Sequence, residues 1–156
     1  MDLRKEYDQY KKKYNLPRYD ELDDEFELLY FHAIEEIKFP LRFVRRRIID
    51  KFSGFIHFLH GILQPNTGSL ISLQESRFFT DKEKDEIGKI IKEMIKFERK
   101  SILLDIEHDE KKDADFIIEG LKKWKIIKKK IYSYAEKAED GWSKEVKEDK
   151  KGHYFG

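Results

Sequence analysis

Residues 40–63 read PLRFVRRRIIDKFSGFIHFLHGIL and form the most apolar long segment of the chain. Aliphatic and aromatic residues recur in it every three or four positions, which puts them on one face of an α-helix. Since this face covers almost half of the helix circumference, we expect the helix to lie at the centre of the fold. Pro40 suits a first helical turn, and the turn residues from Gln64 to Gly68 end the helix. The face consists of Leu41, Val44, Ile48, Phe52, Phe55, Ile56, Leu59 and Ile62.

Helical spacing continues on the N-terminal side of this segment. Residues 3–14 predict a short, highly charged helix that ends before Pro17. A second helix is expected from Asp20, whose side chain can cap it, to Ile37, because apolar residues recur at helical spacing over this range. On the C-terminal side, residues 69–77 predict an ordered loop or a short helix.

Two long helices are predicted in the C-terminal half. Thr80 and Glu83 have the spacing of a capping box, so a helix is expected over residues 80–107. The last helix is expected over residues 113–146, with a stripe that runs from Phe116 through Trp124 to Trp142. This helix runs through Ile87, Ile91, Met94, Ile95, Ile102 and Ile106, and Ile87, Ile91, Met94 and Ile102 define its apolar face.

The fold class predicted from these patterns is all-α. No segment alternates with the two-residue period of a strand for long enough to predict one. We expect four main amphipathic helices in a mostly antiparallel bundle, with the short N-terminal helix beside them. Residues 1–146 are expected to form a single domain and residues 147–156 a flexible tail.

The composition is that of a folded and highly charged protein. Of 156 residues, 42% are charged and 39% hydrophobic, and the net charge is only +1. The absence of cysteine excludes a disulfide scaffold and a zinc–thiolate site. Residues 1–20 lack the apolar core of a secretory signal, and no apolar run is long enough to span a bilayer, so we expect a cytoplasmic location without a membrane partner. Frequent lysine with few thermolabile residues is typical of thermophilic or archaeal proteins.

Polar residues interrupt the apolar helix faces at a few positions. Glu98 and Asp105 lie near the centre of the face expected on the 80–107 helix, and Ser101 lies at its edge. Arg45 points into the apolar face of the 40–63 helix. Because an unpaired buried charge costs several kcal/mol, Arg45 is expected to pair with Glu98 or Asp105. The sequence thus predicts a buried polar cluster of Arg45, Glu98, Ser101 and Asp105.

Two other interpretations of these residues remain open. In one, this face meets a partner helix and the ion pairs form across an interface. In the other, Glu98, Asp105 and His108 are ligands of a carboxylate metal site of the ferritin-like kind, with Glu36 from the second helix. The chain lacks the E-x-x-H motifs of such a site and directs an arginine to the same place, so no cofactor is expected.

Basic residues form strips on two of the predicted helices, and nucleic-acid binding is the alternative function. Such strips bind phosphate backbones through counterion release. Acidic runs at 20–27 and 107–115 would repel a polyanion, and the sequence has no helix-turn-helix, RNP or Gly-rich phosphate motif. The strips are Lys122, Lys123, Lys125, Lys129 and Lys130 on the last helix, and Arg42, Arg46 and Arg47 on the 40–63 helix.

The sequence carries no catalytic motif that we recognise. G-x-S-x-G, H-E-x-x-H and the P-loop are absent, and there is no cysteine nucleophile. We therefore expect an interaction module without catalysis, which contacts another protein or a second copy of itself as a homodimer. The residues expected at this contact are Ile126, Phe43, Trp142, Leu70, Ile71, Phe78 and Phe79.

Overall fold

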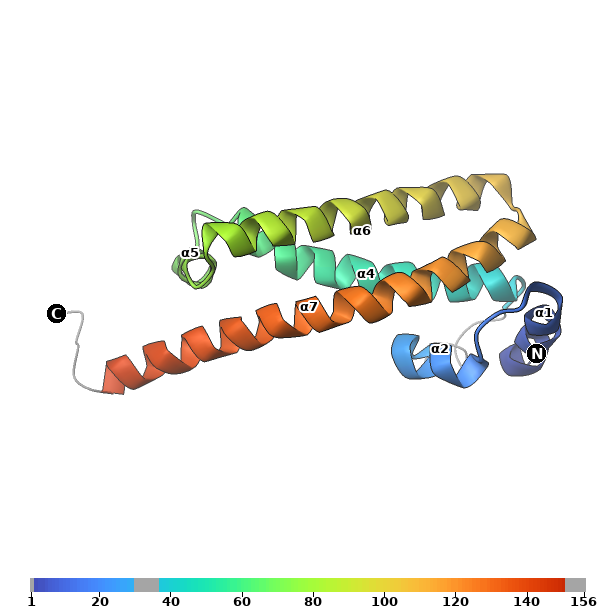
Figure 1. The fold of residues 1–156 in the computed structure, drawn as a ribbon, viewed down its shortest axis with the longest axis horizontal. Coiled ribbons are helices and arrows are strands. Elements are labelled where there is room, and N and C mark those ends of the chain that lie inside the picture. The colour runs from blue at the N-terminus through green and yellow to red at the C-terminus, as the bar shows by residue number, and fades with distance from the viewer. Residues whose placement is uncertain (1, 30–36, 151–156) are drawn as a thin grey trace. The chain divides into compact units, whose positions relative to one another are not determined.

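The computed structural model describes residues 2–29 and 37–150. Of these residues 86% are helical and none lies in a strand, so the predicted all-α class is confirmed. Six helices have defined bounds in the described ranges (Figure 1). They are α1 (Leu3–Tyr14), α2 (Tyr19–Phe26), α4 (Pro40–Leu63), α5 (Leu70–Arg77), α6 (Asp81–Glu107) and α7 (Glu110–Lys150).

The chain separates into two compact units. The first comprises residues 1–54 and 94–125, and the second comprises residues 55–93 and 126–156. The first unit therefore contains α1 and α2, and the second contains α5. Each of the long helices α4, α6 and α7 supplies one part to each unit. The single domain expected over residues 1–146 stays a prediction.

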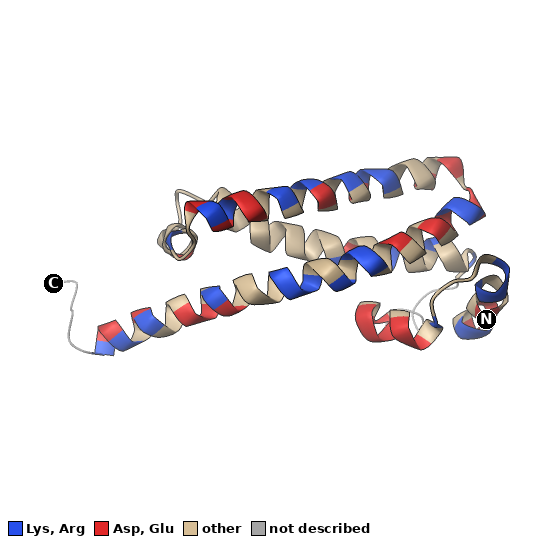
Figure 2. Cartoon of the chain, viewed as in Figure 1, with Lys and Arg blue, Asp and Glu red and all other residues tan. Residues whose placement is uncertain are grey.

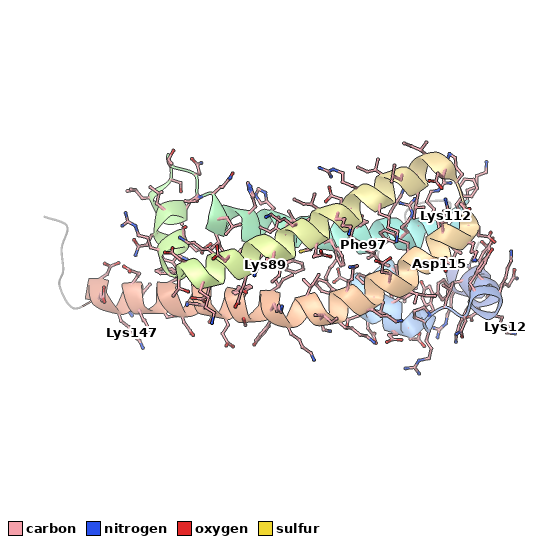
Figure 3. All side chains as sticks on the ribbon, turned by 45° about the horizontal axis from the view of Figure 1, so that its top comes forward. Lys12, Lys89, Phe97, Lys112, Asp115 and Lys147 are labelled. Atoms are coloured by element: carbon pink, nitrogen blue, oxygen red, sulfur yellow. The ribbon has the colours of Figure 1, made fainter. Side chains whose placement is uncertain are left out.

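Aromatic rings from three helices form the core of the first unit. Phe97 of α6, labelled in Figure 3, stacks on Phe116 of α7 with ring centroids 4.0 Å apart and planes 13° apart. The ring of Phe52 of α4 lies 5.4 Å from that of Phe97 and 6.0 Å from that of Trp124. A Cβ at Gly120 would lie only 3.3 Å from Cε1 of Phe97. The glycine therefore lets α7 approach the aromatic rings closely.

The two N-terminal helices pack beside the first part of α7 (Figure 1). Tyr7 of α1 is fully buried, and its hydroxyl donates a hydrogen bond of 2.8 Å to the carbonyl of Pro17. The Tyr7 ring contacts the ring of Tyr19 edge-on, with centroids 5.6 Å apart. Trp124 of α7 donates from Nε1 to Glu25 at 2.6 Å, which ties α2 to α7.

The helix predicted from Asp20 to Ile37 is not continuous. α2 ends at Phe26, and Glu27 adopts the left-handed conformation with φ 55° and ψ 49°. The Glu27 N–H donates to the carbonyl of Asp23 at 2.8 Å, and an Asp23 carboxylate oxygen accepts the N–H of Leu29 at 2.8 Å. The hydrogen bonds of Asp23 thus hold a break that no glycine or proline marks. The part of the predicted helix at residues 30–36 lies outside the described residues.

In the second unit, α5 packs on the C-terminal part of α7. The prediction of an ordered segment at residues 69–77 is confirmed, because α5 is a helix capped by the Ser69 side chain. Phe78 contacts Trp142 edge-on with centroids 5.2 Å apart. A Cβ at Gly141 would lie 2.6 Å from Cε2 of Phe78, so only glycine admits this ring against α7. Phe79 is buried and lies 6.2 Å from the ring of Tyr134.

The buried face of α6 differs from the predicted stripe. Ile87, Ile91 and Met94 are buried as expected, and they are joined by Ile90, Phe97 and Leu104. By contrast, Ile102 is exposed, so its assignment to the apolar face was wrong, and Ile95 and Ile106 are exposed as well. The apolar arc of α6 is wider than the surface that its neighbours cover. The stack of Phe97 on Phe116 fixes which part of that arc is buried.

The last helix is longer than expected at both ends. α7 begins at Glu110 rather than Asp113 and continues to Lys150 rather than ending near Val146. The rest of the expected flexible tail, residues 151–156, lies outside the described residues. None of the described helices is both long and apolar enough to cross a membrane.

Candidate functional site

A fully buried arginine, Arg45, links α4, α6 and α7 in the first unit. Its Nε donates to a carboxylate oxygen of Asp113 at 2.6 Å. Its Nη1 donates to the carbonyl of Ser101 at 2.9 Å and also to the Ser101 hydroxyl. Its Nη2 donates to Asp105. Three residues from two other helices thus hold the guanidinium group through charge-assisted hydrogen bonds.

The two carboxylates of this cluster lie in different surroundings. The Asp113 side chain is only 6% exposed, and burial raises its pKa in spite of the neighbouring Arg45. The Asp105 side chain is 36% exposed, and Arg46 donates to it at 3.3 Å. Burial also acts to raise the pKa of Asp105, but hydrogen bonds and charges from Arg45 and Arg46 outweigh it and lower the pKa. Two arginines and two aspartates therefore form a cluster of balanced charge.

The structure brings together Arg45, Ser101 and Asp105 of the predicted cluster, but not Glu98. Glu98 accepts hydrogen bonds from the Ser53 hydroxyl at 3.1 Å and from a neighbouring arginine on α6, away from Arg45. Asp113 was missed, because it was treated only as the start of the last helix. Its position three and four residues before the buried Phe116 and Ile117 puts it on the same helix face.

The described residues do not assemble the metal site that the sequence allowed. Glu98, Asp105 and His108 each accept a hydrogen bond from an arginine side chain, and these positive charges would repel a cation. Within residues 2–29 and 37–150, no group of three or more His, Cys, Asp or Glu side chains is placed to hold a metal ion. Glu36, considered as a further ligand, lies outside the described residues.

The arginines considered for nucleic-acid binding have partners within the chain. Arg46 pairs with Asp105, and Arg47 pairs with Asp50 at 2.7 Å. Arg42 donates to Nδ1 of His108. Pairing with a carboxylate makes Arg46 and Arg47 less available to phosphates, whereas the partner of Arg42 is an imidazole.

The lysines of the second strip lie on both units. Lys125 pairs with Glu21, and Lys123 lies 3.8 Å from Glu119. Figure 2 shows acidic residues interleaved with the basic ones along α7, and a mainly acidic α2. The strip itself, residues 122–130 of α7, contains no acidic residue, so its partners come from outside this segment. Lys122 and Lys125 are exposed in the first unit, Lys129 and Lys130 are exposed in the second, and Lys123 is half-buried.

The residues expected at a partner contact fall into three groups. Leu70, Ile71 and Ile126 are exposed, as a contact surface requires. Phe43, Phe78 and Trp142 are half-buried, and the last two pack on each other. Phe79 is buried in the core of the second unit, so it offers no surface to a partner and the expectation was wrong for this residue.

Sequence reasoning missed an exposed apolar surface on α6 in the first unit. We call it the α6 band, and it consists of Ile95, Ile102, Leu103 and Ile106, which are 36%, 47%, 58% and 72% exposed. One of these residues, Ile102, was assigned to the apolar face. The signal that could have found the band is the width of the apolar arc of α6, which exceeds what one packed face can bury.

The first unit also holds a pocket of about 430 Å³. It lies where residues from the beginning of α4 meet the turn between α6 and α7. His108 in this turn has φ 55°, a left-handed conformation. The pocket is lined by Tyr10, Phe39, Pro40, Leu41, Arg42, His108, Glu110 and Asp113.

Comparisons of the chain with protein families, with curated proteins and with solved structures find no match. A function must therefore be inferred from the geometry and charge of the described residues alone. The exposed α6 band and the pocket are two surfaces of the described residues for which the fold gives no evident structural role.

Proposed function

We propose that this protein is an interaction module without catalysis that self-associates by packing the α6 bands of two copies together. The observation that carries the proposal is the exposure of four large aliphatic side chains on one helix. Exposed apolar area that becomes buried contributes about 25 cal/mol per Å² to association. Contiguous apolar surface of this kind is typical of protein–protein contacts.

The members of the α6 band are neighbours on the helix surface. Ile95, Ile102 and Ile106 follow one another at spacings of seven and four residues, which align on a single side of a helix. Leu103 lies three residues before Ile106 and widens the band. A partner helix laid along α6 would therefore contact all four side chains.

The charges beside the α6 band favour a second copy as the partner. The exposed Lys96 lies toward its N-terminal end, beside Arg99, which pairs with Glu98; the exposed Glu107, which pairs with Lys112, lies at its C-terminal end. Two α6 helices that pack antiparallel about a two-fold axis place the basic end of each against the acidic end of the other. Symmetric dimers are the commonest assemblies of identical chains.

In this proposal each subunit is a mostly antiparallel bundle of its four main helices and resides in the cytoplasm of a thermophilic or archaeal cell. The ties of Arg45 to α6 and α7 support the bundle. A lysine-rich composition without cysteine supports the setting.

The test is the molar mass of the protein in solution. We expect light scattering coupled to size-exclusion chromatography to give twice the chain mass of 19.0 kDa for the wild type. The double variant Ile102→Glu with Ile106→Glu puts four charges into the paired surface and should elute as a monomer.

The matched control is Leu70→Glu with Ile71→Glu, which replaces two exposed residues of α5 in the second unit by the same amino acid. This control should remain a dimer. A wild-type protein that is monomeric over a concentration series, or a dimer that survives Ile102→Glu with Ile106→Glu, would overturn the proposal.

A further inference from the structure

We propose that the pocket of the first unit binds a small organic anion, namely a molecule with one carboxylate or phosphate group on an apolar or aromatic body, and that Arg42 holds the anionic group. The proposal is independent of self-association, because the pocket residues and the α6 band are different sets of residues.

Arg42 is held in place by Phe39 and His108, and its guanidinium group has a hydrogen-bond donor without a partner. Its guanidinium carbon lies 4.7 Å from the centroid of the Phe39 ring, and its Nη2 donates to Nδ1 of His108. Its Nε is buried and has no hydrogen-bond partner. No carboxylate of the described residues forms an ion pair with Arg42. An arginine held between a ring and an imidazole, with donors left over, is suited to bind a carboxylate or a phosphate.

The two carboxylates that line the pocket are already neutralised by other residues. Glu110 accepts hydrogen bonds from the Tyr14 hydroxyl at 2.5 Å and from Lys13 at 2.9 Å. The bond from Tyr14, together with Lys13, lowers the pKa of Glu110 although partial burial opposes this. Asp113 is bound to the buried Arg45 at 2.6 Å. The charge of Arg42 acts on Asp113 from a distance but is bound directly to no carboxylate of the described residues, and a ligand with a single negative charge would supply such a partner.

The remaining lining is apolar and aromatic. Phe39 lines the pocket and is 52% exposed, and Leu41 and Pro40, which also line it, are buried. Tyr10 adds a second ring. A volume of about 430 Å³ falls within the range of small-molecule sites. The ligand is therefore expected to carry a body of the size of one aromatic ring beside its anionic group.

The end of α6 fixes the position of His108. Its N–H donates to the carbonyl of Leu104 at 3.2 Å, and its left-handed backbone ends the helix, as Asn15 and Glu27 end α1 and α2. In this position Nδ1 of His108 accepts the hydrogen bond from Arg42.

The experiment is a titration followed by ¹⁵N NMR with three ring compounds: 4-fluorobenzoate, phenyl phosphate and the neutral 4-fluorobenzamide. We expect saturable shifts of the amides at residues 39–42 and 108–113 with either anion below about 10 mM, and much weaker shifts with the amide. Comparison of the two anions distinguishes a carboxylate ligand from a phosphate ligand. Inorganic phosphate alone tests whether the ring is needed.

Arg42→Gln should weaken binding of the preferred anion at least about tenfold, since it removes the charge and the fork of donors. The matched control Arg77→Gln changes an exposed arginine of α5 in the second unit and should bind as the wild type does. If Arg42→Gln does not fold by circular dichroism, Arg42→Lys keeps the charge and should still lose affinity. The monomeric variant Ile102→Glu with Ile106→Glu should bind the anion normally, which separates this proposal from self-association.

Absence of saturable shifts with both anions would overturn the proposal. The same holds if the neutral amide binds as tightly as 4-fluorobenzoate, or if a folded Arg42 variant keeps the wild-type affinity.

Discussion

Arg45 is the largest of the fully buried side chains in the described residues, and it is charged. A buried ion pair gains little over well-packed apolar residues, because desolvation of both charges offsets their attraction. Its hydrogen bonds, however, have fixed directions. They are accepted by Asp113 on α7 and by Ser101 and Asp105 on α6. We infer that Arg45 sets the register of these two helices against α4 more than it adds to stability.

Removal of Arg45 alone should be strongly destabilising. Arg45→Met leaves the buried Asp113 without a positive partner, and breaking a buried pair in this way costs roughly 3–5 kcal/mol. Urea unfolding followed by circular dichroism measures the free energy of unfolding. Arg46→Met is the matched control, since the exposed Arg46 makes one long contact and should cost less than about 1 kcal/mol.

The double variant Arg45→Met with Asp113→Leu should recover most of the loss, because no buried charge is then left unpaired. If Arg45→Met unfolds at the same urea concentration as Arg46→Met, the cluster has no structural role and this account of it is wrong.

α6 illustrates how much of one helix is set locally and how much by its neighbours. The predicted capping box is confirmed: the Thr80 hydroxyl accepts the N–H of Glu83 at 3.2 Å, and the Glu83 carboxylate accepts the N–H of Thr80 at 3.0 Å. Glu83 also accepts a hydrogen bond from Lys137 of α7. The beginning of α6 is therefore fixed by four consecutive residues, whereas its rotation depends on what packs against Phe97.

Loss of the cap should weaken the second unit modestly. Thr80→Ala removes the side-chain acceptor at the start of α6 and should lower the free energy of unfolding by about 1 kcal/mol, whereas Thr80→Ser should keep it. Thr67→Ala, in the exposed turn after α4, is the control and should have no measurable effect. Urea unfolding midpoints provide the measurement, and equal midpoints for Thr80→Ala and Thr67→Ala would contradict the role of the cap.

The charge of the protein as a whole is balanced by many ion pairs. The chain has 33 basic and 32 acidic residues, and carboxylates with lowered pKa occur in both units. For Glu83, burial acts to raise the pKa, but hydrogen bonds from Lys137 and Thr80 outweigh it. Protonation of the acidic residues would leave a large positive charge, which repels itself in the compact state.

Acid should therefore destabilise the fold, and the pKa values of these carboxylates set the pH range over which stability is lost. Because the pKa of Asp105 is lowered, the unfolded chain binds a proton more tightly than the folded protein does. The stability that Asp105 contributes is present above its ordinary pKa of about 4 and is lost as the pH falls through the lowered value. Asp113 has the opposite sign, since burial raises its pKa and its protonation favours the folded state.

The free energy of unfolding, measured in urea from pH 7 to about pH 3, should fall steeply only below about pH 4. Asp105→Asn should be less stable at pH 7 and should lose less stability on acidification than the wild type. A variant that follows the wild-type pH dependence in parallel would show that Asp105 carries no such linkage.

The all-α class, the bounds of the helix at residues 40–63 and the cap at Thr80 could all be predicted from the sequence. Each depends on residues within a few positions of one another: helical periodicity, the proline at position 40, and the four residues of the capping box. Interactions of this range are encoded by the order of the residues alone, so reasoning from neighbours suffices for them.

The rotation of α6 that exposes Ile102 and the partnership of Arg45 with Asp113 were decided by packing, whereas the break at Glu27 depends on local hydrogen bonds of Asp23 that periodicity does not reveal. The sequence placed Arg45 on the buried face of α4. Its partner Asp113, however, lies 68 positions further along the chain on α7, and the sequence did not show that Asp113 faces α4. The apolar arc of α6 is wider than one contact surface, so several rotations of the helix about its axis would bury a similar apolar area. The choice among them falls to long-range contacts, such as the stacking of Phe97 on Phe116, which exist only once the helices have come together.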